Sequence, residues 1–310
     1  MAAKRILLIA NPASGQHRGE RRLAQASERL ASLGHAVTAT LTESAGHATR
    51  LAKSNAPDFE IIAALGGDGT VNEVANGLMA VEPGERPALA TLPVGTGNDV
   101  ALTYGLAHFE SAIDALAKGS TRTLDVIRVQ LMRDGKSVTR HALLFVAAGF
   151  AAEVIRKTGP RVKRLFGRRF SYSVGLFRAL ASFRAPEFSV KWDGGEKRGR
   201  MFQVCAGNTE FGAGGVMRIS PGARPDDGLL NISLVGALGR LQIVRRFPSI
   251  LSGRYVEDER VDYFTGKRLE IDAVPPAEFQ ADGDIIGTTP ATIELLPGTL
   301  KLVVHDQLQV

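Results

Sequence analysis

The amino-acid sequence predicts a protein of two domains, an α/β N-terminal domain with a parallel sheet and a β-rich, sandwich-like second domain. Three observations lead to this prediction. The chain has 310 residues, which is enough for two ordinary domains. Strand and helix patterns alternate over about the first 120 residues, and strand patterns dominate after them. Hydrophobic residues make up 44% and charged residues 23%, as in globular proteins with a large core.

The elements of the first domain follow from hydrophobic periodicity and from residues that end helices. Residues 19–33, for example, carry Leu23, Ala26, Leu30 and Leu33 at helical spacing, and Gly34 follows as a C-terminal stop. The same reasoning predicts further helices and four short apolar strands. The strands are residues 5–10, 36–41, 60–65 and 88–93, and the other helices are residues 47–54, 71–79 and 109–118.

The second domain is expected to begin near residues 122–125, where the pattern changes to strands. We assign residues 1–124 to the first domain and residues 125–310 to the second. The extreme C-terminus of the chain is able to pack against the first domain. Without a long flexible linker, the two domains should enclose an active-site cleft. The predicted strands are residues 123–131, 138–146, 188–192, 201–205, 229–235, 268–271, 278–281, 292–295 and 300–304; residues 150–184 and 240–251 read as helical.

A glycine-rich turn, Gly66–Thr70, stands between the strand at 60–65 and the helix at 71–79. Glycines let a backbone approach a ligand closely, and the start of a helix attracts anions. Asp68 in the same turn suits the magnesium ion that accompanies phosphate. The turn therefore predicts a phosphate site.

Four turns of the first half carry small or phosphate-friendly residues after a strand. They are Asn11–Gly15, Thr42, Gly66–Asn72 and Gly95–Asp99. In a parallel sheet such turns gather at the carboxyl edge, where ligands bind. The dinucleotide-binding pattern fails because Asn72 stands where its third glycine belongs, and the Walker pattern fails at Gln130. The histidines lack the close spacing of a zinc site.

Three motifs of this half resemble those of the diacylglycerol kinase catalytic-domain superfamily. They are Asn11-Pro12-x-Ser14-Gly15, Gly66-Gly67-Asp68-Gly69-Thr70-x-Asn72-Glu73 and Pro93-x-Gly95-Thr96-x-Asn98-Asp99. Asp226–Leu230 and Asp282–Asp284 resemble motifs of the family's second domain, so the resemblance covers nearly the whole chain. It is greatest to the bacterial soluble lipid kinases, relatives of sphingosine and ceramide kinases. NAD kinases and phosphofructokinases share the Gly-Gly-Asp-Gly core and this type of first domain, but the other two motifs separate the lipid kinases from them.

The resemblance implies ATP in the first domain and magnesium beside it. The implied nucleotide-binding residues are Asn11, Ser14, Gly15, Thr42, Gly67, Asp68, Gly69, Thr70, Asn72, Glu73 and Thr96. Asp68, Asp99 and Asp125 would surround the catalytic magnesium, and Asp68 and Asp125 would thereby act in catalysis. The alternative for Asp99 is a helix cap, and for Asp125 an acid at a strand edge.

The resemblance also assigns residues of the second domain. The family's general base is the third residue of an Asp-Gly-Glu motif, which here is Asp284, one methylene shorter than the usual Glu. Asp282 is the competing candidate, and a plain turn is the alternative to both. A structural magnesium loop would use the Asp227 carboxylate with the carbonyls of Arg224 and Leu229, unless the loop is only an acidic turn.

Charge is unevenly distributed along the chain. The formal net charge is +6, and seven basic residues without an acid lie between Arg156 and Arg169. Apolar residues are interleaved with them, which favours an anionic membrane surface over a solvated helix face. No nucleic-acid motif accompanies the stretch, so we expect no nucleic-acid partner. The sequence does not decide the oligomeric state, and a homodimer is compatible with it.

The sequence shows no secretory signal and no apolar run long enough to span a membrane. We therefore expect a cytoplasmic protein that associates transiently with membranes. The single cysteine, Cys205, lies in an apolar run and is interpreted as a core residue.

The expected function is transfer of the γ-phosphate of ATP, with magnesium, to the hydroxyl of diacylglycerol or a related lipid, giving phosphatidic acid or an analogous lipid phosphate. Two alternatives remain. One is an NAD kinase, which shares the Gly-Gly-Asp-Gly core. The other is an inactive nucleotide-binding membrane regulator, which the unusual Asp284 leaves open.

Overall fold

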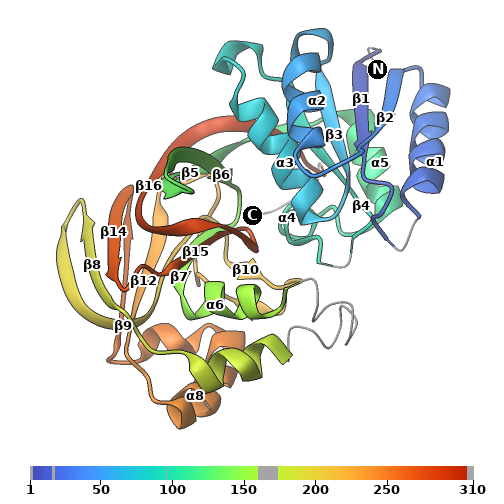
Figure 1. The fold of residues 1–310 in the computed structure, drawn as a ribbon. Coiled ribbons are helices and arrows are strands. Elements are labelled where there is room, and N and C mark those ends of the chain that lie inside the picture. Colours follow the sequence, from blue (N-terminus) through green and yellow to red (C-terminus); the bar gives the residue numbers. More distant parts are fainter. Residues whose placement is uncertain (1–2, 16–17, 96, 160–173, 306–310) are drawn as a thin grey trace. The chain divides into compact units, whose positions relative to one another are not determined.

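The computed structural model describes residues 3–15, 18–95, 97–159 and 174–305. The chain divides into two compact units (Figure 1). Unit 1 contains residues 1–126, 211–216 and 297–310, and unit 2 contains residues 127–210 and 217–296. Strands β5 (Thr121–Arg133) and β16 (Asp284–Val303) each begin in one unit and end in the other.

Unit 1 alternates strands and helices along the chain. Its parallel sheet has the order β2-β1-β3-β4, and the end of β16 pairs with β4 in the same direction, Leu302 opposite Leu89. The elements are β1 (Arg5–Ala10), α1 (Gly19–Ser32), β2 (Ala36–Leu41), α2 (His47–Asn55), β3 (Ile61–Gly66), α3 (Asp68–Met79), β4 (Ala88–Pro93), α4 (Asp99–Thr103) and α5 (Phe109–Lys118), with short 3-10 helices at Ala56–Asp58 and Pro83–Glu85.

Both faces of this sheet are covered by helices, which explains why β1, β3 and β4 are almost continuously apolar. On one face, alternate strand residues such as Ile6, Leu8 and Leu65 pack with Leu30 of α1 and Leu116 of α5. On the other, α2 and α3 lie together, and a Cβ at Gly77 would come within 2.7 Å of the Ala52 Cβ. The amphipathic pattern of each helix therefore fixes which of its own sides packs against the sheet.

Unit 2 is built mainly from antiparallel strands. Its helices are α6 (Phe150–Lys157), residues 174–182 and α8 (Arg240–Ser252), followed by a 3-10 helix at Arg254–Glu257. Its further strands are β6 (Lys136–Ala142), β7 (Phe145–Gly149), β8 (Glu187–Trp192), β9 (Gly195–Gly207), β11 (Met217–Arg218), β12 (Leu230–Gly236), β13 (Val261–Gly266), β14 (Arg268–Val274) and β15 (Glu278–Ala281). Strand β10 (Phe211–Gly212) belongs to unit 1.

Two long strands take part in both layers of unit 2. The first part of β9 pairs with β8, whereas Met201–Gly207 pair with β12 and β7. Similarly, β16 pairs first with β15 and then with β14. One layer has the order β13-β12-β9-β7-β15-β16, and the other runs from β9 through β8 and β14 to β16, β5 and β6. Inward-facing residues such as Phe188, Phe279 and Ile293 fill the core between them.

The structure confirms the predicted fold class, with local differences. Leu143 and Leu144 separate β6 from β7, where one strand was predicted, because their amides bind the Asp282 side chain instead of a neighbouring strand. The predicted strands at 292–295 and 300–304 are parts of β16. Strand β13 was not predicted, since its residues are only partly buried and show no clear alternation.

Candidate functional site

Four predicted turns meet at the carboxyl edge of the parallel sheet. The Asn11 amide donates to the Leu65 carbonyl at 3.1 Å, and the Val94 amide donates to the Gly66 carbonyl at 3.0 Å. Beyond β2, the Thr42 amide donates to the Ala10 carbonyl at 2.8 Å. Backbone bonds therefore hold the ends of neighbouring strands in register, as the parallel topology requires.

Glycine is needed where these turns touch. A Cβ at Gly15, whose φ is +60°, would lie 2.6 Å from the Val94 carbonyl oxygen. A Cβ at Gly95 would lie 2.6 Å from the Gly67 Cα. Two backbones can approach this closely only without side chains, so these glycines bring the three turns together.

Helix α3 begins earlier than the apolar pattern predicted. Gly67 is its N-cap and Asp68 its first residue, whereas the sequence placed the start at Val71. The apolar pattern begins at Val71 because the first turn faces the carboxyl edge of the sheet and carries Asp68 and Gly69 instead. The positive end of a twelve-residue helix thus lies in the glycine turn, where it favours an anion.

Asp68 and Asp99 direct carboxylate oxygens to the same place. Asp68 Oδ1 accepts the Val100 amide at 3.1 Å, and Asp99 Oδ1 accepts the amides of Gly214 and Gly215 at 2.7 and 2.9 Å. The second oxygens face Gly97, where a Cβ would lie 2.9 Å from Asp68 Oδ2 and 4.0 Å from Asp99 Oδ2. Two carboxylates converging on a glycine suit Mg²⁺, which takes one or two carboxylates with phosphate and water oxygens.

The pKa of Asp99 is raised above its usual value. Burial is the main cause, and the charge of Asp68 adds to it, while the amides of Gly215 and Gly214 act in the opposite direction. A divalent cation beside both carboxylates would relieve this repulsion. The electrostatics therefore agree with the geometry of a cation site.

The assignment of Asp125 to the catalytic magnesium, beside Asp68 and Asp99, stays a prediction. Within the described ranges, no three acidic, histidine or cysteine side chains are grouped to hold a metal ion. Asp125 is 3% exposed on β5, and its Oδ1 accepts the Gly298 amide at 2.7 Å. Its carboxylate therefore fastens β5 to β16.

The other predicted nucleotide residues have varied surroundings. Ser14 and Thr70 are buried, and Asn72 accepts a bond from the Asn76 amide group within α3. The Glu73 carboxylate accepts the Gly46 and Ala48 amides, so it holds the start of α2. Thr96 lies outside the described residues. Asn98 Oδ1 is buried without a hydrogen-bond partner among the residues that the structure describes. Since buried polar atoms are normally hydrogen-bonded, this oxygen is a candidate for contact with a bound ligand.

The loop Ala213–Gly215 was not predicted to belong to this site. It comes from the second half of the sequence but lies in unit 1, where its amides bind Asp99. Ala213, Gly214 and Gly215 have φ values of 58, 75 and 74°, which turn consecutive amides to one side. The adjacent glycines were the signal in the sequence, but only the fold shows which carboxylate they serve.

In unit 2, the turn between β15 and β16 distinguishes Asp282 from Asp284. The Asp282 carboxylate accepts the amides of Leu143, Leu144 and Phe145 at 2.7, 3.0 and 3.1 Å. Asp284 begins β16 and is exposed. Asp282 therefore stabilises the turn, and of the two acids Asp284 is the better placed to meet a substrate.

Gln280, which lies on β15 next to this turn, also supports it and was not indicated by the sequence. Its side chain is fully buried, and its Oε1 accepts the Gly283 amide at 2.9 Å. Its Nε2 has no partner among the described residues. Gln280 thus holds the backbone that presents Asp284.

The predicted structural magnesium loop is a tight turn. Asp227 Oδ1 accepts the Leu229 amide at 2.9 Å, and Gly228 has a φ of 72°. Nearby, Arg224 pairs with Asp226 at 3.6 Å. The assignment of Arg224, Asp227 and Leu229 to a magnesium ion stays a prediction.

Most of the basic stretch lies outside the described residues, which end at Gly159 and resume at Val174. In its described part, Arg156 pairs with Glu153 at 2.7 Å and with Glu278 at 3.4 Å. Lys157 pairs with Glu153 at 3.5 Å. These two charges are therefore partly neutralised within unit 2.

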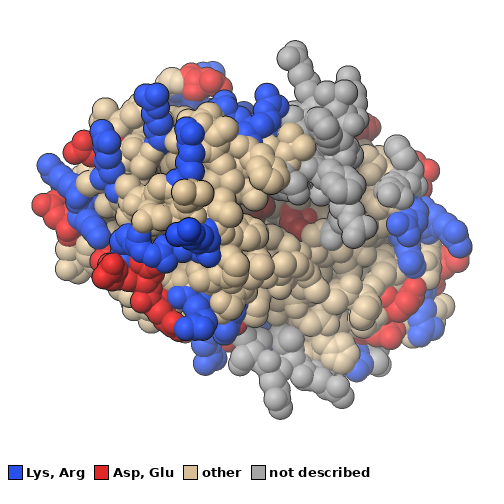
Figure 2. Space-filling view, turned by 90° about the horizontal axis from the view of Figure 1, so that it is seen from below, with Lys and Arg blue, Asp and Glu red and all other residues tan. Residues whose placement is uncertain are grey.

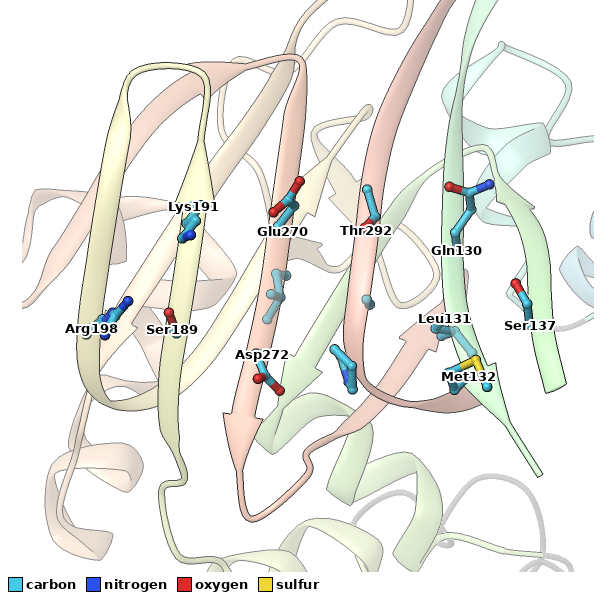
Figure 3. A pocket seen from close by; sticks show the side chains of 13 residues that line it. Gln130, Leu131, Met132, Ser137, Ser189, Lys191, Arg198, Glu270, Asp272 and Thr292 are labelled. Atoms are coloured by element: carbon cyan, nitrogen blue, oxygen red, sulfur yellow. The ribbon is translucent and has the colours of Figure 1, made fainter. Parts of the chain in front are cut away.

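A shallow pocket of about 460 Å³ lies on the solvent-facing side of β8, β14, β16 and β5 (Figure 3). Lys191, Arg198, Glu270 and Asp272 are among its lining residues. None of the predicted site residues lines it. Because its lining carries charges of both signs and its shape is open, this pocket does not indicate a particular class of ligand.

Comparison with known proteins identifies the family. Residues 5–129 match the diacylglycerol kinase catalytic domain, and residues 144–304 match the YegS C-terminal NAD kinase beta sandwich-like domain. The chain belongs to the diacylglycerol kinase family. It is accordingly an enzyme, a kinase, whose two family domains together account for most of its length.

Individual relatives agree over nearly the whole chain. A diacylglycerol kinase of Bacillus subtilis (strain 168) is 28% identical over 93% of this chain and 92% of its own length. One of Staphylococcus aureus (strain bovine RF122 / ET3-1) is 28% identical over 93% and 88%. The crystal structure of a diacylglycerol kinase from Bacillus anthracis str. Sterne superposes with a TM-score of 0.75 at 25% identity, covering 99% of this chain and 98% of that one.

Proposed function

We propose that this kinase transfers the γ-phosphate of ATP, with Mg²⁺, to the hydroxyl of diacylglycerol or a closely related lipid, giving phosphatidic acid or an analogous lipid phosphate. The observation that carries the proposal is the convergence of Asp68 and Asp99 on Gly97, beside the N-terminus of α3. The kinases to which the chain is similar support the choice of acceptor.

The residues of unit 1 would hold the donor. Phosphoryl transfer depends on positioning and on neutralising charge. The backbone of the glycine turns and the start of α3 would bind phosphate oxygens, while Asp68 and Asp99 would hold the metal. Bound magnesium would supply the positive charge that the phosphate oxygens require.

Asp284 of unit 2 would act on the acceptor. An exposed carboxylate can take the proton of a lipid hydroxyl that lies within hydrogen-bond reach. Asp282 and Gln280 would keep the turn in place without touching the reacting atoms, because their oxygens already accept backbone amides.

The lipid acceptor requires contact with a membrane. Among the described residues, no helix is both long and apolar enough to cross a bilayer. We propose that the protein acts at the surface of anionic membranes, with Arg161–Arg169 contributing charge.

The direct test incubates the purified chain with γ-labelled ATP, Mg²⁺ and a panel of hydroxyl lipids, with NAD as a further acceptor. Label in phosphatidic acid is expected. Label in NAD alone would favour an NAD kinase, and ATP binding without transfer to any acceptor would favour an inactive regulator. A total lipid extract then identifies the preferred acceptor.

Gly97→Ala tests the cation site within that assay. Its methyl group would approach Asp68 Oδ2 to 2.9 Å, so the Mg²⁺ concentration needed for half-maximal activity should rise. Gly84→Ala is the matched control, since nothing lies within 4 Å of its added methyl group. An unchanged Mg²⁺ requirement in Gly97→Ala would contradict this placement of the metal.

A further inference from the structure

Helix α8 of unit 2 has apolar side chains on two opposite sides. Its inner side carries Ile243, which is 7% exposed and packs with Phe150 and Phe202. Its outer side carries Leu241 and Val244, which are 74% and 58% exposed, and Leu251, which is 38% exposed. A surface helix normally has polar residues on its outer side, so this second apolar side indicates a contact beyond unit 2.

A neighbouring helix extends the same surface. Residues 174–182 pack on the inner cluster through Ala179, and Arg240 Nη2 at the start of α8 donates to the Ala181 carbonyl at 2.7 Å. Phe177 of this segment is 71% exposed. We call the exposed residues Phe177, Leu241, Val244 and Leu251 the outer apolar face.

The charges around the outer apolar face are basic. Neither α8 nor residues 174–184 contain an acidic residue, while Arg178, Arg184 and Arg245 are exposed. Arg246, on the inner side, pairs with Asp258 at 2.7 Å, and beyond α8 Glu257 pairs with Arg254 at 3.2 Å. Figure 2, seen from below the view of Figure 1, shows Lys and Arg side chains on the surface with Asp and Glu side chains among them.

We propose that the outer apolar face of α8 and its neighbour enters the interfacial region of an anionic lipid bilayer. Apolar side chains flanked by arginines match a surface with acyl chains below anionic headgroups. A second copy of the chain is less well suited, because pairing two such faces would bring arginines together without acids to offset them. This inference rests on the proposed function, since a lipid kinase must reach its acceptor in a membrane.

A fluorescent label can report the insertion directly. The only cysteine, Cys205, is 1% exposed and burial raises its pKa to about 12, so Leu241→Cys can be labelled selectively with an environment-sensitive dye. Vesicles of equal parts phosphatidylcholine and phosphatidylglycerol should shift the emission to the blue, and phosphatidylcholine alone should shift it much less. Leu33→Cys, on an exposed position at the end of α1, is the control and should not respond.

Sedimentation with the same vesicles tests the apolar contribution. The double variant Leu241→Gln/Val244→Gln should bind roughly tenfold more weakly or worse, because it removes two exposed apolar side chains that the bilayer would bury. Leu33→Gln should bind like the wild type. An unchanged thermal melting curve shows that the double variant is folded, as expected for outward-facing positions.

The outcomes separate this inference from the proposed kinase activity. Activity on a short-chain diacylglycerol dispersed without vesicles should be equal in the wild type and the double variant. If neither phosphorylates that lipid, the proposed function fails, and the vesicle results still decide the inference. Equal vesicle binding by wild type and double variant would overturn it. A blue shift that depends on protein concentration without vesicles would also overturn it, in favour of self-association.

Discussion

Two acidic turns of this protein contain the same pair Asp-Gly and use the aspartate differently. In the β3–α3 turn of unit 1, Asp68 accepts one amide and keeps Oδ2 directed at Gly97. In the β15–β16 turn of unit 2, Asp282 accepts three amides, and the next acid, Asp284, is the exposed one. The two aspartates therefore differ in how many backbone amides they accept, which agrees with the proposed ligand-binding role of Asp68 and with a structural role for Asp282.

The largest effect is expected at the first turn. Asp68→Asn should lower kcat/KM by about a hundredfold to a thousandfold, because a carboxylate that stabilises charge in the transition state is lost. The Asn oxygen can still accept the Val100 amide, so circular dichroism and melting temperature should stay the same. Asp114→Asn on the exposed side of α5 is the control. Loss of folding in Asp68→Asn would place this residue with Asp282 instead.

In the second turn, the exposed acid should matter for catalysis. Asp284→Asn should lower kcat by at least about a hundredfold, since a general base contributes that much. Its free energy of unfolding should not change. Asp284→Glu, which restores the residue usual in the family, should keep substantial activity. Full activity in Asp284→Asn across the pH range would remove this residue from the mechanism.

Asp282, the partly buried acid of the same turn, should show the opposite behaviour. Asp282→Asn keeps the size of the side chain but replaces an acceptor with a donor, so three amides lose a charged partner. We expect the free energy of unfolding to fall by about 2 kcal/mol or more, measured by urea denaturation against Asp284→Asn. Equal stability of these two variants would contradict the distinction between the two acids.

The sequence predicts much of the fold because its local signals agree. The apolar strands of unit 1 and the helix Phe109–Lys118 were predicted and are present, and the predicted strands at 123–131 and 138–146 are joined by a hairpin at Asp134-Gly135. The hairpin follows from two residues with positive φ, which Asp-Gly favours. Helix α8 was also predicted within one residue, although its outer apolar face was not.

The site is less predictable, because it depends on contacts between distant segments. Motifs identified Asp68 and Asp99, but the amides of Gly214 and Gly215 that bind Asp99 lie 115 and 116 residues away along the chain. The same limit applies to Asp125, which forms its bond with Gly298 at a separation of 173 residues. Motifs indicate which acids are candidates, but burial and backbone donors decide what each one does.

The smallest effect, a pH dependence, distinguishes Asp99 from an ordinary surface acid. Burial raises its pKa in the folded state above the usual value of 3.8, so the folded protein takes up this proton at a higher pH than the unfolded chain. The ionised carboxylate therefore costs stability at neutral pH. This cost begins to decline as the pH falls through the folded-state pKa, and it is gone below the unfolded-state pKa.

Asp99→Asn removes this ionisation while its oxygen can still accept the amides of Gly214 and Gly215. Without nucleotide or metal, the variant should be slightly more stable than the wild type at pH 7, and the difference should vanish below the unfolded-state pKa. Urea denaturation across this pH range measures it, with Asp114→Asn as the exposed comparison. The opposite result, a variant less stable than the wild type at neutral pH, would contradict this prediction. It would mean that the negative charge of Asp99 stabilises the Ala213–Gly215 loop by more than the burial of that charge costs. Asp99 would then resemble Asp282 more than Asp68.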